Sequence, residues 1–155
     1  MHRLSPVETG PATESDVAAL VPLMRGYCEF YEASPPDESL VAMAEALIAS
    51  PDDEGMLWVA RDGDGNPIGF AAAGWKWSSL RGARIVVLED LFVAPESRGA
   101  GAGSALIEAC ADRARELGAP VVTWLTAPDN HRAQAVYDRA GARADPFLEY
   151  ELELD

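Results

Sequence analysis

The sequence predicts an α+β fold, an α/β sandwich in which a mixed central sheet of about six or seven strands carries helices on both faces. Three observations support this prediction. Three β-rich runs follow one another at residues 56–61, 67–77 and 84–93, which indicates antiparallel pairing. A strand–helix–strand order over residues 88–127 implies a right-handed crossover. The 155 residues contain no internal repeat and no linker, so we expect a single domain over residues 1–155.

The N-terminal third is predicted to contain one strand and two helices. Residues 3–7 form an edge strand, because the proline within it lacks the N–H group that a central strand requires. Thr13 or Ser15 caps the first helix, whose apolar residues recur at helical spacing as far as Tyr31. Asp37 is the expected cap of the second helix.

The remaining elements complete the sheet and its covering helices. Residues 62–66 are rich in Gly and Asp and form a hairpin turn between the first two strands of the antiparallel set. A long helix with an apolar face follows the third strand and ends at Gly118. We expect a buried parallel strand at residues 120–127, a helix at residues 130–140 and a final alternating strand at residues 147–154.

Composition limits the classes of function. The chain is 48% hydrophobic and 25% charged, as in soluble globular proteins. With 12 basic and 26 acidic residues its formal net charge is -14, which argues against nucleic acid and favours a cationic substrate. Solubility alone would explain the same charge. No apolar run approaches the roughly 18 residues of a membrane span, and no hydrophobic signal segment follows residues 1–6, so a cytoplasmic location without membrane association is expected.

Disulfide and metal chemistry are not expected. Cys28 and Cys110 each lie on the apolar face of a predicted helix, where packing in the core is the expected role. His2 and His131 lack the spacing of metal ligands. No metal is therefore predicted.

Residues 88–106, LEDLFVAPESRGAGAGSAL, connect an apolar strand to a helix through a glycine-rich loop. The first N–H groups of a helix lack intrahelical partners, and the peptide dipoles make this end positive. Glycines allow a large anion to approach the backbone, and Arg98 adds a fixed cation. The loop lacks the lysine of a P-loop and the spacing of a Rossmann fingerprint. We interpret it as a pyrophosphate site; a turn that only begins a helix is the alternative.

The pattern R-x-x-G-x-G from Arg98 to Gly103 resembles the coenzyme A loop of the GNAT superfamily of N-acyltransferases. Three further matches agree: the preceding strand, the Gly-Ala pair that ends the last helix, and the helix pattern of Asn130, Ala133, Val136 and Tyr137. The resemblance extends from about Glu14 to Leu154, although the N-terminal half matches only in element order. The motif region is most similar to the diamine and polyamine acetyltransferase branch.

The resemblance implies a GNAT fold in which the fourth strand, ending at Val93, splays from the fifth strand, beginning near Val121, as a V. It implies acetyl-CoA as cosubstrate, with the pantetheine amides pairing like an added strand. Family members often carry a bulge near residues 89–91, and the sequence leaves open whether this chain does. The cofactor-binding residues that the resemblance implies are Leu91, Phe92, Val93, Arg98, Gly99, Ala100, Gly101, Ala102, Gly103, Ser104 and Asn130.

Acetyl transfer to an amine requires a neutral amine and a proton for the leaving thiolate. Tyr137 resembles the general acid of the family, and a phenol is protonated at neutral pH; packing of its ring is the alternative. Asn130 orients the cofactor, caps its helix, or does both. Glu89 and Asp90 are carboxylates within an apolar strand, which indicates a polar cleft. We take Glu89 as general base and Asp90 as substrate contact or second base, with an arginine ion pair as the alternative for each.

The polyamine-like branch implies a small acceptor with a primary amine and positive charge. Glu29, Tyr31 and Glu32 at the end of the first helix would form an acidic rim, and Trp77 would add a cation–π face. Aminoglycosides, protein amines and amino acids remain open as acceptors. A non-catalytic acyl-CoA-sensing or partner-binding domain on the same fold also remains open. The apolar residues of the last strand either pair in a homodimer or pack inward.

Overall fold

The computed structural model describes residues 6–51 and 53–155. The chain forms two compact units, one ending at Leu125 and the other running from Thr126 to Asp155. The first unit contains the sheet and the glycine-rich loop, and the second contains one helix and the C-terminal segment.

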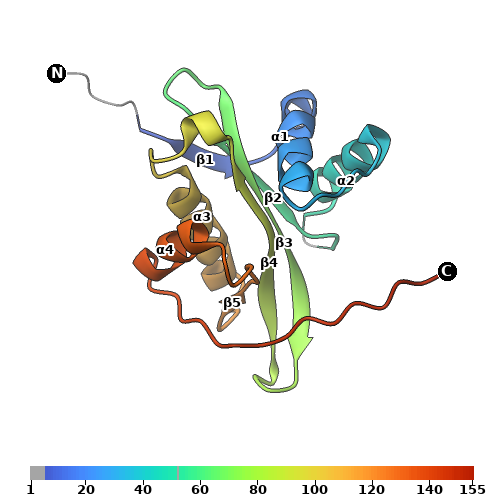
Figure 1. Ribbon diagram of the computed structural model, residues 1–155, viewed down its shortest axis with the longest axis vertical. Coiled ribbons are helices and arrows are strands. Elements are labelled where there is room, and N and C mark those ends of the chain that lie inside the picture. Colours follow the sequence, from blue (N-terminus) through green and yellow to red (C-terminus); the bar gives the residue numbers. More distant parts are fainter. Residues whose placement is uncertain (1–5, 52) are drawn as a thin grey trace. The chain divides into compact units, whose positions relative to one another are not determined.

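A mixed sheet forms the centre of the first unit, with strand order β1-β2-β3-β4-β5 (Figure 1). Strands β1 to β4 pair antiparallel, as predicted for the three consecutive runs, and β5 runs parallel to β4. The described residues form five strands rather than the six or seven predicted. Their bounds are β1 Glu8–Pro11, β2 Met56–Arg61, β3 Pro67–Ser78, β4 Ala83–Val93 and β5 Val122–Thr123.

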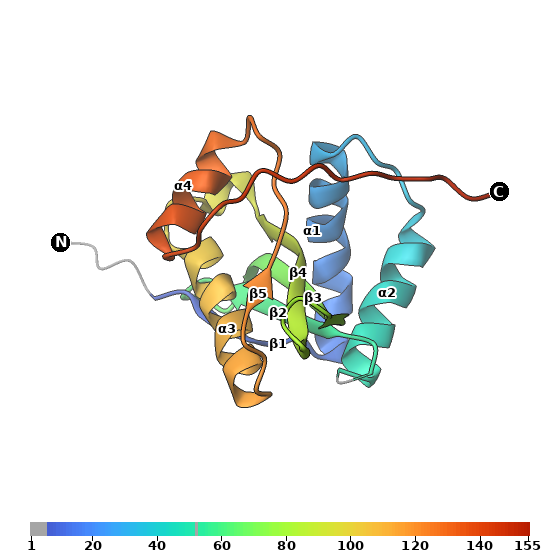
Figure 2. The same ribbon diagram turned by 90° about the horizontal axis from the view of Figure 1, so that it is seen from below.

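Helices cover both faces of this sheet, as predicted. Figure 2 shows α1 and α2 on one face and α3 on the other. Asp37 lies inside the first turn of its helix, and Pro36 occupies the cap position expected for Asp37. The helices of the first unit are α1 (Val17–Phe30), α2 (Asp37–Ala49) and α3 (Ala102–Glu116), with short 3-10 turns η1 (Glu14–Asp16) and η2 (Pro95–Ser97); the second unit contains α4 (His131–Arg139).

The core lies between the sheet and its helices. Leu20, Met24 and Phe70 are fully buried on the face that α1 and α2 cover. Burying a side chain of this size contributes roughly 1.5–3 kcal/mol. Cys110 is buried on α3 and Cys28 packs against the core cluster, so both cysteines pack as predicted. Burial raises the pKa of the Cys110 thiol to about 12.

The N-terminal strand begins later than predicted. The sequence predicted a strand over residues 3–7, of which residues 3–5 lie outside the described part of the chain. The strand is β1, which pairs with β2 from Glu8 opposite Arg61 to Pro11 opposite Trp58. Because β1 has only one neighbour, its terminal proline is tolerated there, as at any sheet edge.

The fifth strand is shorter than the predicted run over residues 120–127. It comprises two residues, Val122 and Thr123, which pair with Val86 and Val87 of β4. Beyond Val87 no strand in the described part of the chain pairs with this edge of β4. The pairing between β4 and β3 becomes irregular two residues later, at Glu89. A β-bulge of this kind bends its own strand.

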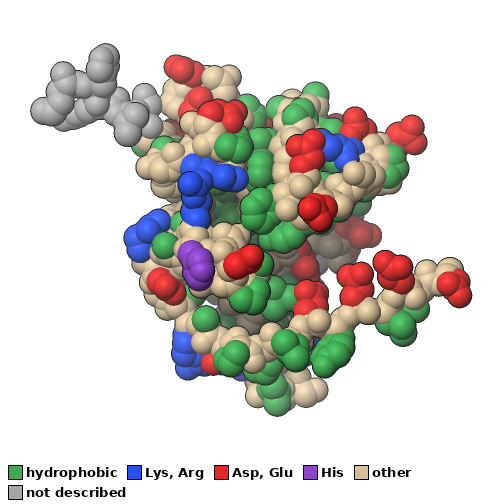
Figure 3. All heavy atoms as spheres, in the orientation of Figure 1, with side chains coloured by type: hydrophobic (Ala, Val, Ile, Leu, Met, Phe, Trp, Pro, Cys, Tyr) green, Lys and Arg blue, Asp and Glu red, His purple; other side chains and the backbone are tan. Residues whose placement is uncertain are grey.

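The final strand predicted at residues 147–154 is wrong. Those residues belong to no helix or strand, and their large apolar side chains are 82–88% exposed. Figure 3 shows hydrophobic and acidic side chains interspersed along this C-terminal segment. An alternating pattern defines two faces, but a strand forms only where a neighbouring backbone accepts the ladder of hydrogen bonds.

Among the described helices, none combines the length and the apolar composition that a bilayer span requires.

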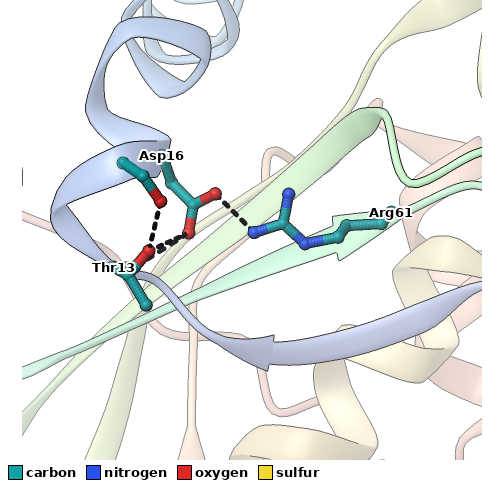
Figure 4. A network of polar contacts seen from close by, with 4 residues as sticks. Thr13, Asp16 and Arg61 are labelled. Atoms are coloured by element: carbon teal, nitrogen blue, oxygen red, sulfur yellow. Dashed lines mark hydrogen bonds and ion pairs between the residues drawn. The ribbon is translucent and has the colours of Figure 1, made fainter.

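A polar network around the buried Asp16 carboxylate secures the start of α1. Thr13 donates its backbone N–H to the Asp16 carboxylate over 2.8 Å, and Arg61 of β2 forms an ion pair with the same carboxylate (Figure 4). Burial alone would raise the pKa of Asp16. The hydrogen bonds from Arg61 and Thr13, together with the Arg61 charge, outweigh burial and lower the pKa below 3.8. This network ties the first helix to the sheet.

Replacing Asp16 with asparagine is expected to lower the free energy of unfolding by about 2–3 kcal/mol at pH 7, because it leaves part of the Arg61 charge without its partner. The folded pKa is depressed, so this stabilisation is present above pH 3.8 and is lost as the pH falls through the lowered folded value. Urea unfolding should show wild type and Asp16→Asn converging in acid. The matched control is Asp112→Asn, since Asp112 pairs with Arg115 on an exposed helix face; it should cost under about 0.5 kcal/mol. Equal effects of the two substitutions would contradict the prediction.

Candidate active site

Strand β4 carries a β-bulge at the carboxylate pair. Ala72 of β3 lies opposite Asp90, and Ala73 lies opposite Leu88, so Glu89 is the extra residue. Because Ala72 and Ala73 face opposite sides of the sheet, Asp90 and Leu88 also face opposite sides. The bulge that the sequence left open is therefore present. It places the Asp90 side chain on the face of the sheet opposite to the one that simple alternation along β4 would assign.

The C-terminal half of α1 meets this bulge. The Tyr27 hydroxyl donates to the backbone carbonyl of Glu89 over 3.4 Å, and the Asp90 carboxylate lies close enough to shift the pKa of this phenol. The ring of Tyr31, one helical turn later, lies 5.0 Å from the Tyr27 ring between centroids. Two phenols and a carboxylate are thus adjacent beside the bulge.

Burial and proximity shift the pKa values of all three groups. Burial raises the pKa of Tyr27, and the Asp90 charge and its hydrogen bond raise it further. Burial and the Asp90 charge also raise the pKa of Tyr31. Burial raises the pKa of Asp90, while the hydrogen bond from Tyr27 acts in the opposite direction. Both phenols therefore remain protonated donors at neutral pH.

Tyr27 was missed as a site residue by sequence reasoning. Its position on the apolar face of the first helix indicated core packing, and its ring does pack edge-on against Phe70, with 6.1 Å between centroids. The available signal was its spacing of four residues from Tyr31, which places both side chains on one face of a helix.

The glycine-rich loop presents backbone amides at the start of α3. Gly99 and Gly101 adopt left-handed conformations, with φ of 92° and 87°, that other residues rarely accept. Gly101 is the N-cap and no side chain caps this end, so the first amides of the helix, from Ala102 to Ser104, lack intrahelical partners. The first turn contains no acidic residue, and space for a Cβ at both glycines is open. This geometry suits an anion.

Arg98 joins the loop to the end of β4. Its Nε donates to the Val93 carbonyl over 3.1 Å, and its guanidinium lies 5.9 Å from the centre of the Phe92 ring. The Ala94 N–H donates to the Ile68 carbonyl of β3. Because backbone groups alternate in direction along a strand, the N–H and C=O of Phe92 point toward β3, and those of Leu91 and Val93 point toward the other edge. Of the predicted pairing residues, Leu91 and Val93 therefore present their carbonyls at this edge, and Arg98 already engages that of Val93.

The remaining predicted substrate residues lie in two places. Glu29 and Glu32 are exposed at the end of α1, near Tyr31, and Glu32 has a φ of 57° in the turn that ends the helix. Trp77 is 75% exposed near the far end of β3, opposite Arg84. Ala72, the partner of Asp90, lies five residues earlier, roughly 17 Å away along an extended strand. The structure therefore does not bring Trp77 to the bulge.

The second unit contains Asn130 and Tyr137. Asn130 caps α4, since its Oδ1 accepts from the Ala133 N–H over 3.2 Å, so the capping role is confirmed. Tyr137 lies in the last turns of α4 with a partly exposed side chain. Gly141, with a φ of 87°, ends this helix as predicted. In the described residues, no group of three His, Cys, Asp or Glu side chains could hold a metal ion.

The chain is similar to known N-acetyltransferases. Residues 20–142 match the model of the Acetyltransferase (GNAT) family. The uncharacterized N-acetyltransferase YhfO of Bacillus subtilis is 34% identical over 144 residues, which cover 92% of this chain and 95% of YhfO. The D-amino-acid N-acetyltransferase HPA3 of Saccharomyces cerevisiae is 39% identical over 95 residues, which cover 59% of either chain.

A solved structure shares the fold. The aminoglycoside N-acetyltransferase AAC(6')-Iy, in complex with CoA, superposes with a TM-score of 0.83 and 22% identity, covering 99% of this chain and 98% of its own. At this level of identity the likeness concerns the fold alone.

Proposed function

The chain belongs to the GNAT acetyltransferase family and is an N-acetyltransferase, and we propose that it transfers an acetyl group from acetyl-CoA to the primary amine of a small, cationic acceptor. Members of this family use acetyl-CoA as the acetyl donor. The observation that carries the proposal is the bulge in β4, which inserts Glu89 next to Asp90 beside an edge that no described strand covers. Residues 1–155 are proposed to act as one functional domain.

The glycine-rich loop is proposed to bind the diphosphate of coenzyme A. Its left-handed glycines expose the amides at the start of α3, and Arg98 contributes charge while remaining attached to Val93. The backbone of Leu91 faces the uncovered edge of β4, where the amides of the pantetheine arm would pair. Asn130 would orient the cofactor in addition to capping α4. The proposed cofactor-binding residues are those that the family resemblance implied, residues 91–93, 98–104 and 130.

Two residues are proposed to carry the chemistry. Glu89 accepts a proton from the acceptor ammonium, directly or through water, so that a neutral amine attacks the thioester carbonyl. The new bond joins the amine nitrogen to the acetyl carbon, and the carbon–sulfur bond breaks. Tyr137 donates its phenolic proton to the leaving thiolate, and the surplus proton on the new amide nitrogen returns to the phenolate, directly or through water. The exposed position of Glu89 on the bulge supports its access to solvent protons.

A cationic acceptor is supported by charge. The chain has a net charge of -14, and Asp90 lies beside the rings at the end of α1. Polyamine-like amines are the acceptors that we propose. D-amino acids and aminoglycosides are the acceptors named for the relatives HPA3 and AAC(6')-Iy, and protein amines complete the alternatives.

A thiol-release assay tests the proposal. Acetyl-CoA is mixed with the protein and with polyamines, aminoglycosides, D-amino acids or peptides, and coenzyme A thiol is measured with a disulfide reagent. The raised pKa of Cys110 keeps that thiol protonated and slow to react at neutral pH. Thiol release that depends on the amine supports the proposal. Binding of acetyl-CoA, seen as a raised melting temperature, with no release for any amine would favour a non-catalytic acyl-CoA sensor instead.

Replacing Arg98 with alanine is expected to raise the KM for acetyl-CoA by about 10- to 100-fold, since charge-assisted hydrogen bonds contribute roughly 1.5–3 kcal/mol. The KM for the amine should change little. Arg81→Ala is the matched control, because Arg81 is exposed in the turn between β3 and β4. Steady-state kinetics with acetyl-CoA varied distinguish the two variants. Equal KM values for Arg98→Ala and wild type would remove Arg98 from the diphosphate site.

A further inference from the structure

The β3–β4 hairpin extends beyond the neighbouring strands of the sheet (Figure 1). Pairing of β3 with β2 stops at Ala73, whereas its pairing with β4 continues for five more residues, as far as Ser78 opposite Ala83. Among the described residues, no strand pairs with the other side of residues 74–78, which we call the open edge. An edge of this kind presents backbone groups to which another chain can add a strand.

The backbone groups of two tryptophans point out of the open edge. The Val86 N–H donates to the Val121 carbonyl over 3.2 Å, on the side of β4 where β5 lies. Directly opposed residues of an antiparallel pair turn their backbone groups either both toward each other or both away. Trp75 lies opposite Val86, so its N–H and C=O point away from β4 to the open edge. Those of Trp77, two residues later, do the same.

The side chains of the open edge alternate between aromatic and cationic. Trp75 and Trp77 share one face of the sheet, and Lys76 lies on the other. The Arg84 guanidinium lies 4.4 Å from the centre of the Trp75 ring, and the Trp77 side chain is 75% exposed. None of the ion pairs within residues 6–51 and 53–155 includes Lys76. An added strand would therefore meet aromatic rings on one face and a cation without an ion-pair partner on the other.

The hairpin is positively charged on an acidic protein. The sequence contains 26 aspartates and glutamates, and none of them lies within residues 65–88, where lysine and arginine provide the only charges. Such a surface favours an acidic partner. A long polyanion such as nucleic acid would also meet the net charge of -14, whereas a short acidic segment reaches the hairpin alone.

The C-terminal segment, residues 147–154, has the complementary pattern. As a strand it would have one face of leucine and tyrosine and one face of glutamate, because the two kinds of residue alternate. These residues belong to no strand, and their large apolar side chains are 82–88% exposed. Each chain therefore contains a strand pattern without a neighbouring backbone and a strand edge without a neighbour.

We propose that the C-terminal segment of a second copy adds to the open edge of β3 as a further strand. The apolar face of the segment packs against Trp75 and Trp77, and its glutamates lie beside Lys76. A shift by one residue would exchange the two faces, so the alternation on both strands selects the register. Two copies that each donate a segment to the other make equivalent contacts and form a two-fold dimer.

Sedimentation equilibrium of the full chain, without substrates, tests this association. We expect wild type to dimerise reversibly. Trp77→Thr should raise the dimer dissociation constant by about tenfold, because it removes an aromatic cross-strand contact at both equivalent edges while threonine retains strand propensity. Leu80→Thr is the matched control, since Leu80 is 99% exposed in the turn beyond the open edge; its dissociation constant should stay within about twofold of wild type.

A second pair of variants tests the charge. Lys76→Glu places a carboxylate against the acidic face of the segment and should weaken the dimer by about tenfold or more, because like charges then face each other at both edges. Arg132→Glu makes the same change of charge at an exposed position of α4 and should have an effect below about twofold. Tyr150→Phe keeps the ring and the alternation of the segment and should leave the dimer unchanged.

A synthetic peptide supplies the segment separately. The peptide PFLEYELELD, residues 146–155, should dissociate the dimer by competition, whereas a peptide of the same composition in scrambled order should not. Hydrogen exchange of the Trp75 and Trp77 amides should be slow in the dimer and fast in the diluted monomer, because only the added strand protects them.

Four outcomes would each overturn the inference: a wild type that remains monomeric, equal effects of Trp77→Thr and Leu80→Thr, equal competition by the two peptides, or slow exchange of both amides in the monomer. The last outcome would place the segment on the edge of its own chain. Since no measurement requires a substrate, a negative result here leaves the proposed acetyl transfer standing, and a failed thiol-release assay leaves the dimer standing.

Discussion

Tyr137→Phe is expected to lower kcat by about 10²- to 10⁴-fold, the range typical of a lost general acid or base. The substitution keeps the ring on α4 and removes the proton that would reach the departing thiolate. Because the hydroxyl is not required to bind the cosubstrate, the dissociation constant of acetyl-CoA should remain within about twofold of wild type. Single-turnover kinetics measure the chemical step, and calorimetry measures the binding.

Tyr150→Phe is the matched control, since Tyr150 lies in the same unit as Tyr137 and is 88% exposed. Its kcat should equal that of wild type. A Tyr137→Phe enzyme that turns over at the wild-type rate across the whole pH range would show that the phenol only packs, which is the alternative that the sequence left open.

Glu89→Gln is expected to lower kcat/KM for the amine by about 10²- to 10⁴-fold at pH 7, because glutamine cannot accept the proton of the ammonium group. The difference in kcat/KM between Glu89→Gln and wild type should become smaller as the pH approaches the pKa of the acceptor amine, because a growing fraction of the amine is then already neutral. Initial rates over a pH series, with both substrates varied, measure this difference.

Two controls define which carboxylate is the base. Glu54→Gln changes an exposed glutamate in a turn before β2 and should leave the pH profile unchanged. Asp90→Asn should leave the pH dependence of kcat/KM close to wild type. The reverse outcome, with Asp90→Asn changing the pH profile and Glu89→Gln not, would assign the base to Asp90.

The regular elements were predictable because their signals are local. The strands at residues 56–61, 67–77 and 84–93 combine β-rich composition with turns of Gly, Asp and Asn, and the structure ends them within one residue of the predicted positions. The glycine pattern after Arg98 is also a local signal, since glycine permits the left-handed φ values that Gly99 and Gly101 adopt.

The features that the sequence could not supply depend on pairing between distant segments. The extra residue at Glu89 exists only relative to the register between β3 and β4. The contact of the Tyr27 hydroxyl with the Glu89 carbonyl joins residues 62 positions apart in the sequence. The C-terminal alternation at residues 147–154 predicted a strand, yet alternation alone provides no neighbouring backbone, and those residues remain outside the sheet.

The hydrogen bond from Arg98 Nε to the Val93 carbonyl would determine where along β4 the cosubstrate can pair with the strand. Since that acceptor is already taken, the first vacant carbonyl on this edge belongs to Leu91, two residues or roughly 7 Å further from the glycine-rich loop. The same arginine would then act as a spacer. It would contact the diphosphate with its guanidinium while its Nε occupies the nearest backbone acceptor, so the thioester would reach a fixed depth relative to the bulge.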